Sequence, residues 1–316
     1  MEKPFLTIEQ QILKLRSQGL SITSNKHVID FLCTHSYYSI VNGYCDLFVK
    51  SKMPRKFKEG SSFYELEALY NFDTGFARYL LKQILYIEDK IKATCISEFC
   101  GARKGKAFLY PRDAYLEVSS YSVTTEKKAK SVEQLIKDFK KAIETNIKNK
   151  NQPFVHAKTN YGYIPFWILA SNLTFGQLSK FYECLKFETR ERIANKFGLE
   201  QKDLRVALKI LNQIRNLSAH SNRVFNAYIP FVFSSQIGVN GKIFKIDPNA
   251  NYKFGSVLIA IKFLVNTDRF HEITKHLGGY LLGLEKKLKI VSIKDVLRNM
   301  GISPQMNKDM KIIRLT

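Results

Sequence analysis

The 316-residue sequence lacks the marks of an exported or membrane-embedded protein. It has no apolar run of about 18 residues, the length that a membrane-spanning helix needs. Its N-terminus, MEKPFLTIEQQ, has no apolar stretch of about 7 to 15 residues and no small-residue cleavage site. No basic helix has a purely apolar opposite face, so anchoring at a membrane surface is not favoured either. We therefore expect no membrane partner and a reducing, cytoplasmic location.

Cysteine is scarce, and motifs for several kinds of chemistry are missing. The five cysteines lie among apolar neighbours, with no CxxC pair and no histidine at zinc-ligand spacing, so we expect small buried residues. There is no Gly-rich phosphate loop and no GxSxG, which leaves ATP-driven and acyl-transfer chemistry unsupported. We expect neither a metal nor another cofactor.

Acidic residues are few compared with basic ones. Fifty Lys and Arg against 28 Asp and Glu give a formal net charge of +22, which opposes compaction by self-repulsion. A polyanionic partner explains this charge most simply. Nucleic acid fits best, because neutralising phosphates with Lys or Arg releases condensed counterions. A basic protein without a nucleic-acid role remains the alternative.

Apolar residues at helical spacing dominate the chain, so we predict a mainly α fold. The expected helices run from the Thr7 cap to Gly19 and over about His27–Thr34, Ser62–Gly101, Val132–Ile143, Pro165–Asn172, Thr174–Phe187, Glu200–Ser218, Gly255–Asn266, Phe270–Leu288 and Ser292–Asn299. Between Ala227 and Lys245 the period changes, and Asn240-Gly241 predicts a β-hairpin. The basic stretch Lys50–Gly60 is predicted to be a loop.

A Lys-rich insert occupies about residues 103–160. Apolar residues from Val132 to Ile143 keep helical spacing within it, which predicts an exposed amphipathic helix. Its lysines could be a merely solvated face, or a positive surface that contacts RNA phosphates without reading sequence. The candidate RNA-binding lysines are Lys127, Lys128, Lys130, Lys137, Lys140 and Lys141.

The long helix predicted over Ser62–Gly101 carries an acidic residue within its apolar stretch. Glu88 lies four residues before Lys92, a spacing at which opposite charges support one another on a helix. The interpretations are a structural ion pair with Lys92 and an inward-pointing catalytic acid.

The segment RNLSAHSNRVFN, Arg215 to Asn226, is the best candidate for a site. A guanidinium can hold a phosphate through two parallel hydrogen bonds, and an imidazole can accept or donate a proton near neutral pH. These groups suffice for RNA cleavage without a metal. On a continuous helix Arg215 and His220 are about 140° apart, so they converge only if Arg215 reaches along the helix or the helix loosens near Ser218. Such a pair also occurs by chance.

The surroundings of that segment are similar to those in AbiD/AbiF-type abortive-infection proteins of the HEPN ribonuclease superfamily. RNLSAH followed by SNRVFN resembles the RN-x3-H signature with its trailing Arg and Asn. FKEGSSFYELEALYNFD (57–73), IEDKIKA (87–93) and WILASNLTFGQLSKFY (167–182) resemble other blocks of the family, as does the aromatic block from Tyr37 to Tyr44. These blocks run in family order from about Leu13 to Tyr228.

The resemblance implies a HEPN-like helical bundle over 1–228, elaborated by the Lys-rich insert. Residues 229–316 match no family block and are expected to add the hairpin and C-terminal helices to the same domain. Arg215 and His220 would be the catalytic pair, and Asn216 would position the phosphate or the helix end. Arg223 and Asn226 would order the segment or contact RNA.

The resemblance also implies partners and a biological setting. Because HEPN nucleases commonly build one site from two motifs and this chain has one, a homodimer is implied. The setting would be a toxin that cleaves cellular RNA during phage infection, restrained by a partner that could be a small noncoding RNA. The alternatives are a non-catalytic RNA-binding defence protein and a protein-interaction adaptor whose RNA affinity reflects charge alone.

Overall fold

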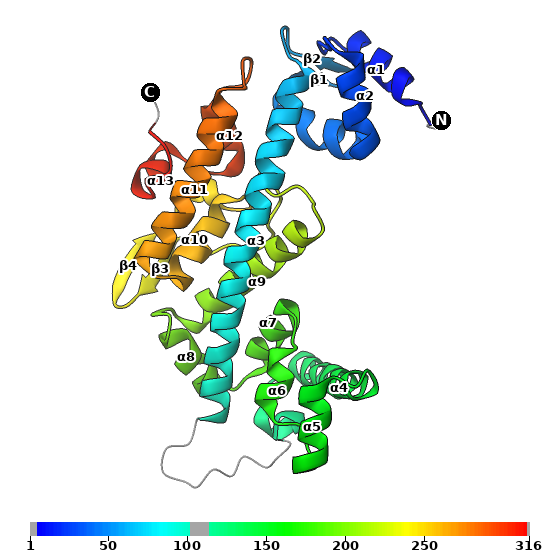
Figure 1. Cartoon of the computed structure of the whole chain (residues 1–316). Helices are drawn as coiled ribbons and strands as arrows, with labels where there is room; N and C mark the ends of the chain where they lie inside the picture. The colour runs from blue at the N-terminus through cyan, green and yellow to red at the C-terminus, as the bar shows by residue number, and fades with distance from the viewer. Residues whose placement is uncertain (1–4, 102–113, 315–316) are drawn as a thin grey trace.

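A computed structural model describes residues 5–101 and 114–314, and the chain is mainly helical, as predicted (Figure 1). The first residues of the Lys-rich insert, up to 113, lie outside the described residues. The helices are α1 (Ile8–Ser17), α2 (Asn25–Thr34), α3 (Phe63–Cys100), α4 (Glu126–Lys148), α5 (Gln152–Tyr161), α6 (Phe166–Ser171), α7 (Phe175–Cys184), α8 (Phe187–Asn195), α9 (Gln201–Ala219), α10 (Gly255–Leu264), α11 (Thr267–Glu285), α12 (Ile293–Met300) and α13 (Pro304–Asp309). The strands are β1 (Val49–Lys52), β2 (Arg55–Phe57), β3 (Gln236–Val239) and β4 (Lys242–Lys245).

Helix α3 is the element on which the others assemble. It begins with a capping box in which the Ser62 N–H donates to the Glu65 carboxylate at 3.2 Å, and it continues for 38 residues to Cys100. At 1.5 Å per residue it is about 57 Å long. Figure 1 shows it running through the molecule, and α6, α8, α9 and α11 all pack against it.

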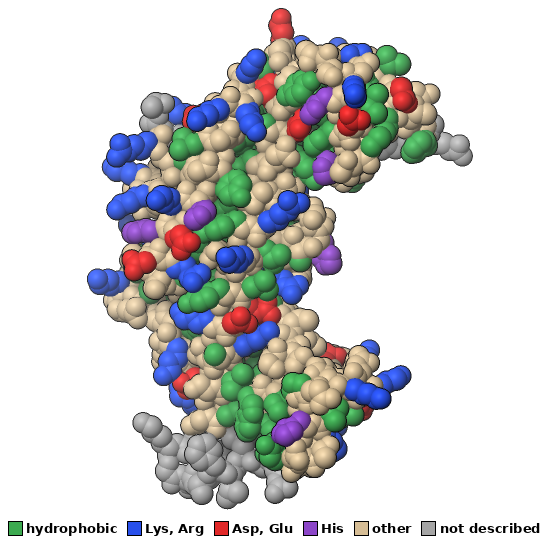
Figure 2. Space-filling model, viewed as in Figure 1, with side chains coloured by type: hydrophobic (Ala, Val, Ile, Leu, Met, Phe, Trp, Pro, Cys, Tyr) green, Lys and Arg blue, Asp and Glu red, His purple; other side chains and the backbone are tan. Residues whose placement is uncertain are grey.

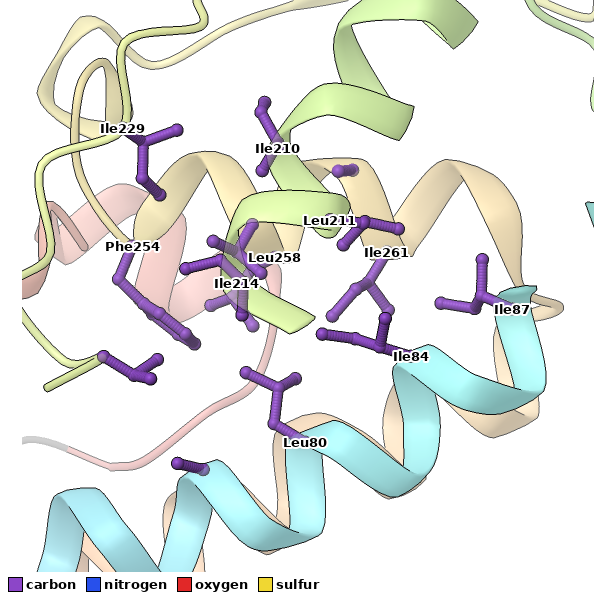
Figure 3. Close-up of a cluster of buried hydrophobic side chains, with 14 of the residues drawn as sticks. Leu80, Ile84, Ile87, Ile210, Leu211, Ile214, Ile229, Phe254, Leu258 and Ile261 are labelled. Carbon is purple, nitrogen blue, oxygen red and sulfur yellow. The ribbon is translucent and has the colours of Figure 1, made fainter. Parts of the chain in front are cut away.

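The core around α3 fixes the position of α9. Figure 3 shows apolar side chains of three helices facing one another: Leu80, Ile84 and Ile87 of α3, Ile210, Leu211 and Ile214 of α9, and Leu258 and Ile261 of α10. All eight are fully buried. Burial of each such side chain stabilises the fold by about 1.5 to 3 kcal/mol relative to exposure. The predicted apolar stripe of α9 is therefore confirmed, and it packs against both α3 and α10.

The Lys-rich insert forms the predicted amphipathic helix, α4. Val132, Leu135 and Phe139 are buried, and α4 packs against α6 and α7. The Phe139 ring lies 6.1 Å from the Phe181 ring of α7. The insert thus joins α6 and α7 in one helical unit, the α4–α7 unit.

The loop prediction for Lys50–Gly60 was wrong. Strands β1 and β2 form an antiparallel hairpin there, in which Val49 pairs with Phe57. Phe57 is buried, and its N–H donates to the Gln18 carbonyl at 2.8 Å. The strands have four and three residues and carry charged side chains on their exposed face, so the alternation is too short to detect.

The other hairpin was predicted correctly. Strands β3 and β4 turn at Asn240-Gly241, where both residues have positive φ (48° and 75°), as a tight hairpin turn requires. Helices α10, α11 and α12 follow as predicted, and Ser292 caps α12 by accepting from the Asp295 N–H at 3.1 Å.

Three helices, α5, α8 and α13, were not predicted. Helix α8, FETRERIAN, shows why: only Ile193 and Ala194 are buried, so it has almost no apolar periodicity. The cysteine prediction is confirmed for Cys45, Cys95 and Cys184, which are buried, but Cys33 is exposed. None of the described helices has the length and apolarity needed to cross a bilayer.

The arrangement of units leaves a hollow beside the end of α9. Figure 1 shows the N-terminal unit (α1, α2, β1 and β2) and the α4–α7 unit near opposite ends of α3, on one side of it. Figure 2 shows the surface hollowed between these units. The C-terminal end of α9 and the segment after it lie between them, beside the middle of α3 (Figure 1).

Candidate functional site

The candidate pair lies at the C-terminal end of α9. The helix stays regular through Ala219, and His220 is its C-cap, with its N–H donating to the Asn216 carbonyl at 3.1 Å. Ser221 then takes a left-handed conformation (φ 53°), and the Asn222 N–H donates back to the Leu217 carbonyl at 2.8 Å. Because the helix does not loosen near Ser218, the backbone keeps Arg215 and His220 about 140° apart.

Arg215 points toward α3. It follows the buried Ile214, and its Nε lies 3.8 Å from Oε2 of Glu88. The Glu88 side chain is 6% exposed, and its Oε1 pairs with Nζ of Lys92 at 3.0 Å. The structural pair with Lys92 is therefore confirmed, and Glu88 also points inward, toward Arg215. At 3.8 Å the contact with Arg215 is an ion pair and not a hydrogen bond.

The segment after α9 is anchored to α3 by a buried carboxylate. Asp73, 2% exposed, accepts the N–H of Phe225 at 2.8 Å and that of Val224 at 3.0 Å. The Tyr44 hydroxyl donates to the same carboxylate at 2.7 Å. Such charge-assisted bonds are about twice as strong as neutral ones, so Asp73 holds the segment firmly.

Burial has the largest effect on the pKa of the Asp73 carboxyl. Loss of solvent raises the pKa of this carboxyl from 3.8 to about 6. The hydrogen bonds from Tyr44, Val224 and Phe225 and the charge of Arg223 oppose that rise. Burial and the neighbouring Asp73 likewise raise the pKa of the Tyr44 hydroxyl.

Arg223 and Asn226 lie within the anchored segment. Arg223 is half-buried and donates from Nη1 to the carbonyl of Gly43, in the turn that leads to Tyr44. Asn226 is also half-buried. The hydrogen bond of Arg223 ties the segment to the chain just before Tyr44.

Several buried polar atoms around the end of α9 have no hydrogen-bond partner within the chain. They are Glu88 Oε2, Gln213 Oε1, Arg215 Nε, Ser218 Oγ and Asn226 Oδ1. Buried polar groups are nearly always satisfied, so a concentration of such atoms marks a place where something from outside the chain, water or a ligand, completes the bonding. The His220 side chain, by contrast, is exposed.

The predicted lysines lie apart from this pair in the fold, on the α4–α7 unit. Lys127, Lys130, Lys137, Lys140 and Lys141 are exposed, and Lys128 is half-buried. Lys130 pairs with Glu126 one turn earlier at 2.6 Å, a surface contact worth little. The unit connects to the candidate pair through α7, which packs against α9.

Sequence reasoning missed the roles of Tyr44 and Asp73. Both stand in blocks that resemble the family, yet neither was given a function. The detectable signal was an acidic residue, Asp73, at a position where the apolar spacing of α3 requires burial. Its partners, the backbone N–H groups of Val224 and Phe225, could not be predicted, because every residue except proline carries a backbone N–H.

Two further observations concern a metal-ligand set and the groove between α3 and α11. Within residues 5–101 and 114–314, no group of three His, Cys, Asp or Glu side chains gathers as a metal-ligand set. The groove between α3 and α11, about 750 Å³, is lined by no residue of α9 or of the segment after it.

Comparison with known proteins yields one family. The model of a family described as Abi-like protein matches residues 30–226, more than half of the chain. The match begins in α2 and ends at Asn226, so it includes Asp73, Glu88, Arg215 and His220. No curated protein and no solved structure gives a significant match.

The anchor at Asp73 can be tested by substitution. Asp73→Asn should lower the free energy of unfolding by about 2 kcal/mol, because the amide NH2 would face backbone N–H donors that then lack an acceptor. Tyr44→Phe should cost about 1.5 kcal/mol by removing one charge-assisted bond. Urea denaturation measures both. Asp89→Asn, an exposed aspartate on the same helix, is the control, and an equal loss there would contradict the anchor.

The raised pKa of Asp73 predicts a direction of pH dependence. The folded chain binds the proton more tightly (pKa about 6) than the unfolded chain (3.8), so the stabilising contribution of this group falls as pH rises from about 4 to 6. The stability of the wild type minus that of Asp73→Asn should therefore decline over this window, measured by urea denaturation at several pH values. A difference that grows with pH would mean that the hydrogen bonds outweigh burial.

Proposed function

The chain belongs to the Abi-like protein family, and from that premise we propose that it is a metal-independent ribonuclease in which Arg215 and His220 act on RNA. Family membership supports a role in abortive infection, the defence in which an infected bacterium limits phage. Cleavage of cellular RNA by a toxin is the finer form of that role proposed here.

The observation that carries the proposal is the state of the two side chains at the end of α9. Glu88 keeps the Arg215 guanidinium in place through an ion pair, and the Arg215 side chain is still 30% exposed, so the positioned cation can also meet a phosphate. His220 is exposed at the helix end, where its imidazole is free to reach a substrate. The anchor at Asp73 prevents this helix end from fraying.

The roles follow from the chemistry of RNA cleavage. The imidazole of His220 takes the proton of the ribose 2′-hydroxyl, which attacks the adjacent phosphorus, and the bond to the leaving 5′-oxygen breaks as that oxygen is protonated. The Arg215 guanidinium stabilises the negative charge that grows on the phosphate oxygens. Asn216, exposed one position beyond Arg215, holds the phosphate.

A single protomer supplies only part of this site. Arg215 points toward α3 while His220 is exposed about 140° further around the helix, so the second proton-transfer group must come from elsewhere. In our proposal a second copy of the chain brings its own α9 end to the same phosphate. The functional form is therefore a homodimer.

The charge of the molecule supports RNA as both substrate and restrainer. Figure 2 shows Lys and Arg side chains at many places on the visible face, with Asp and Glu side chains interspersed among them, and the formal net charge of the chain is +22. Such a surface binds phosphate over many nucleotides without sequence preference. A small noncoding RNA that occupies this surface would restrain the toxin until infection.

A second candidate function is a non-catalytic RNA-binding defence protein. Engagement of Arg215 with the buried Glu88 favours it, because a guanidinium held this way can simply clamp an RNA backbone. The two functions differ in what the loss of His220 does to affinity.

His220→Ala should reduce cleavage of single-stranded RNA by at least about 100-fold, the contribution of one general acid–base group. Its RNA affinity should stay within about twofold of the wild type, since phosphate contacts elsewhere dominate binding. Cleavage in the presence of EDTA and fluorescence anisotropy measure the two quantities. His271→Ala, an exposed histidine on α11, is the matched control. Equal falls in affinity and toxicity, with no cleavage by the wild type, would favour the non-catalytic function.

The lysines of α4 can be tested through salt. The triple variant Lys137→Ala, Lys140→Ala, Lys141→Ala should flatten the slope of log affinity against log salt by about 0.7 for each phosphate that is no longer neutralised. A triple Ala variant at Lys275, Lys286 and Lys287, exposed on or just after α11, is the control. If both triples flatten the slope equally, α4 has no special role and binding follows net charge.

A further inference from the structure

A polar pocket lies against the candidate pair, between α7 and α9. Its volume is about 520 Å³, within the range of roughly 300–1,000 Å³ that small-ligand sites occupy. Asn216, the neighbour of Arg215, lines it, so the pocket is adjacent to the candidate site. We call it the α7–α9 pocket.

One face of α9 supplies amide side chains to this pocket. Asn212, Gln213 and Asn216 are spaced so that they share a helix face, and all three line it. The Nε2 of Gln213 donates to the Tyr228 carbonyl at 2.7 Å, which fixes the orientation of the amide and leaves Oε1 as an acceptor without a partner. Carboxamides are the side chains that pair with the edges of nucleobases.

The pocket also offers an aromatic ring and a cation. Phe231 lines it, and the Lys209 ammonium lies 5.9 Å from the centre of that ring. The charge of Lys209 is offset by Glu183 at 2.6 Å, whereas Lys180 lines the same pocket from α7 without a described ion pair. A ring for stacking and a cation for phosphate accompany the amides.

The block FGQLS on α7 forms the opposite wall. At Gly176, a Cβ would lie 3.4 Å from Oδ1 of Asn212, at the short end of ordinary van der Waals contact, so the Asn212 amide lies close to α7. The buried hydroxyl of Ser179 lies one turn further along α7 and also lines the pocket.

We propose that the α7–α9 pocket binds one unstacked nucleotide of single-stranded RNA next to the cleaved phosphate. Its base stacks on Phe231, its edge meets the amides of Asn212 and Gln213, and its phosphate meets Lys180. Single-stranded RNA is read in this way, by aromatic stacking and hydrogen bonds to splayed base edges. The inference rests on the proposed function, because it assigns the base preference of that same site.

The buried, unpaired acceptor Oε1 of Gln213 predicts which base is disfavoured. An acceptor pairs with an N–H of the base edge. Adenine, cytosine and guanine offer an exocyclic amine, whereas uracil offers only its N3–H, which lies between two carbonyl oxygens that repel Oε1. Oligouridine should therefore bind most weakly, by about fivefold or more relative to the best homopolymer, as expected when one hydrogen bond to a base edge is weakened.

The test uses the full chain carrying His220→Ala, so that RNA probes stay intact. Fluorescein-labelled A10, C10, G10 and U10 are titrated by anisotropy, with the four mononucleotides as competitors. Added substitutions are Asn212→Ala, Gln213→Ala and both together, with Gln305→Ala, an exposed amide on α13, as the matched control. Thermal melting monitors folding, because Gln213 also holds Tyr228; Asn212→Ala alone keeps the test valid if the Gln213 variants unfold.

The expected result is weakest binding of U10 and a spread between homopolymers that shrinks below about twofold in the amide variants but persists in Gln305→Ala. Phe231→Leu should weaken all four probes about tenfold, and Phe231→Tyr should not, because it keeps the ring.

Competition by mononucleotides at low concentration would place a free nucleotide, rather than an RNA chain, in the pocket and overturn the chain assignment. Tight binding of all four probes with no effect of these variants overturns the pocket alone. No binding of any probe by the chain overturns the proposed RNA function with it.

Discussion

The anchoring of the end of α9 to α3 is the constraint on which the candidate site depends. The apolar stripe of α9 packs against Leu80, Ile84 and Ile87, and the segment that follows is tied to Asp73, about two turns before Leu80 on the same helix. Hydrophobic burial is not directional, so packing alone would let α9 slide or rotate. The hydrogen bonds of Asp73 are directional, and they fix the register in which Arg215 meets Glu88.

The free-energy cost of burying carboxylates explains why polar groups surround Asp73 and Glu88. A carboxylate as buried as Asp73 is tolerated only when donors compensate for the missing water, and here two backbone N–H groups and Tyr44 do so. Glu88 is compensated less completely, since Lys92 serves one of its oxygens and the other faces Arg215 at 3.8 Å. The two carboxylates thus differ: Asp73 is a satisfied anchor, whereas Oε2 of the buried Glu88 has no hydrogen-bond partner within the chain.

The sequence predicted the parts of the site that depend on local order, and it missed those that depend on distant contacts. The limits of α9, the amphipathic α4 and the β3–β4 turn follow from spacing, charge and Asn240-Gly241, which act within a few residues. The bonds from Val224 and Phe225 to Asp73 span 151 and 152 residues and use backbone groups, so no pattern encodes them. The direction in which Arg215 points could not be predicted either. Helical periodicity assigns a side chain to one face of a helix, but it does not identify the residues that this face contacts.

In the proposed RNA complex, the basic surface of α4 and the polar α7–α9 pocket are joined through one helix. Helix α7 packs against both α4 and α9, so its two contacts join the lysines of the amphipathic helix to the α7–α9 pocket. Contacts with phosphates carry affinity but no sequence information, whereas contacts with base edges supply the sequence information. In the proposed complex a single rigid helix therefore couples the two, and a strand held along α4 would be presented to Arg215 and His220 in one register.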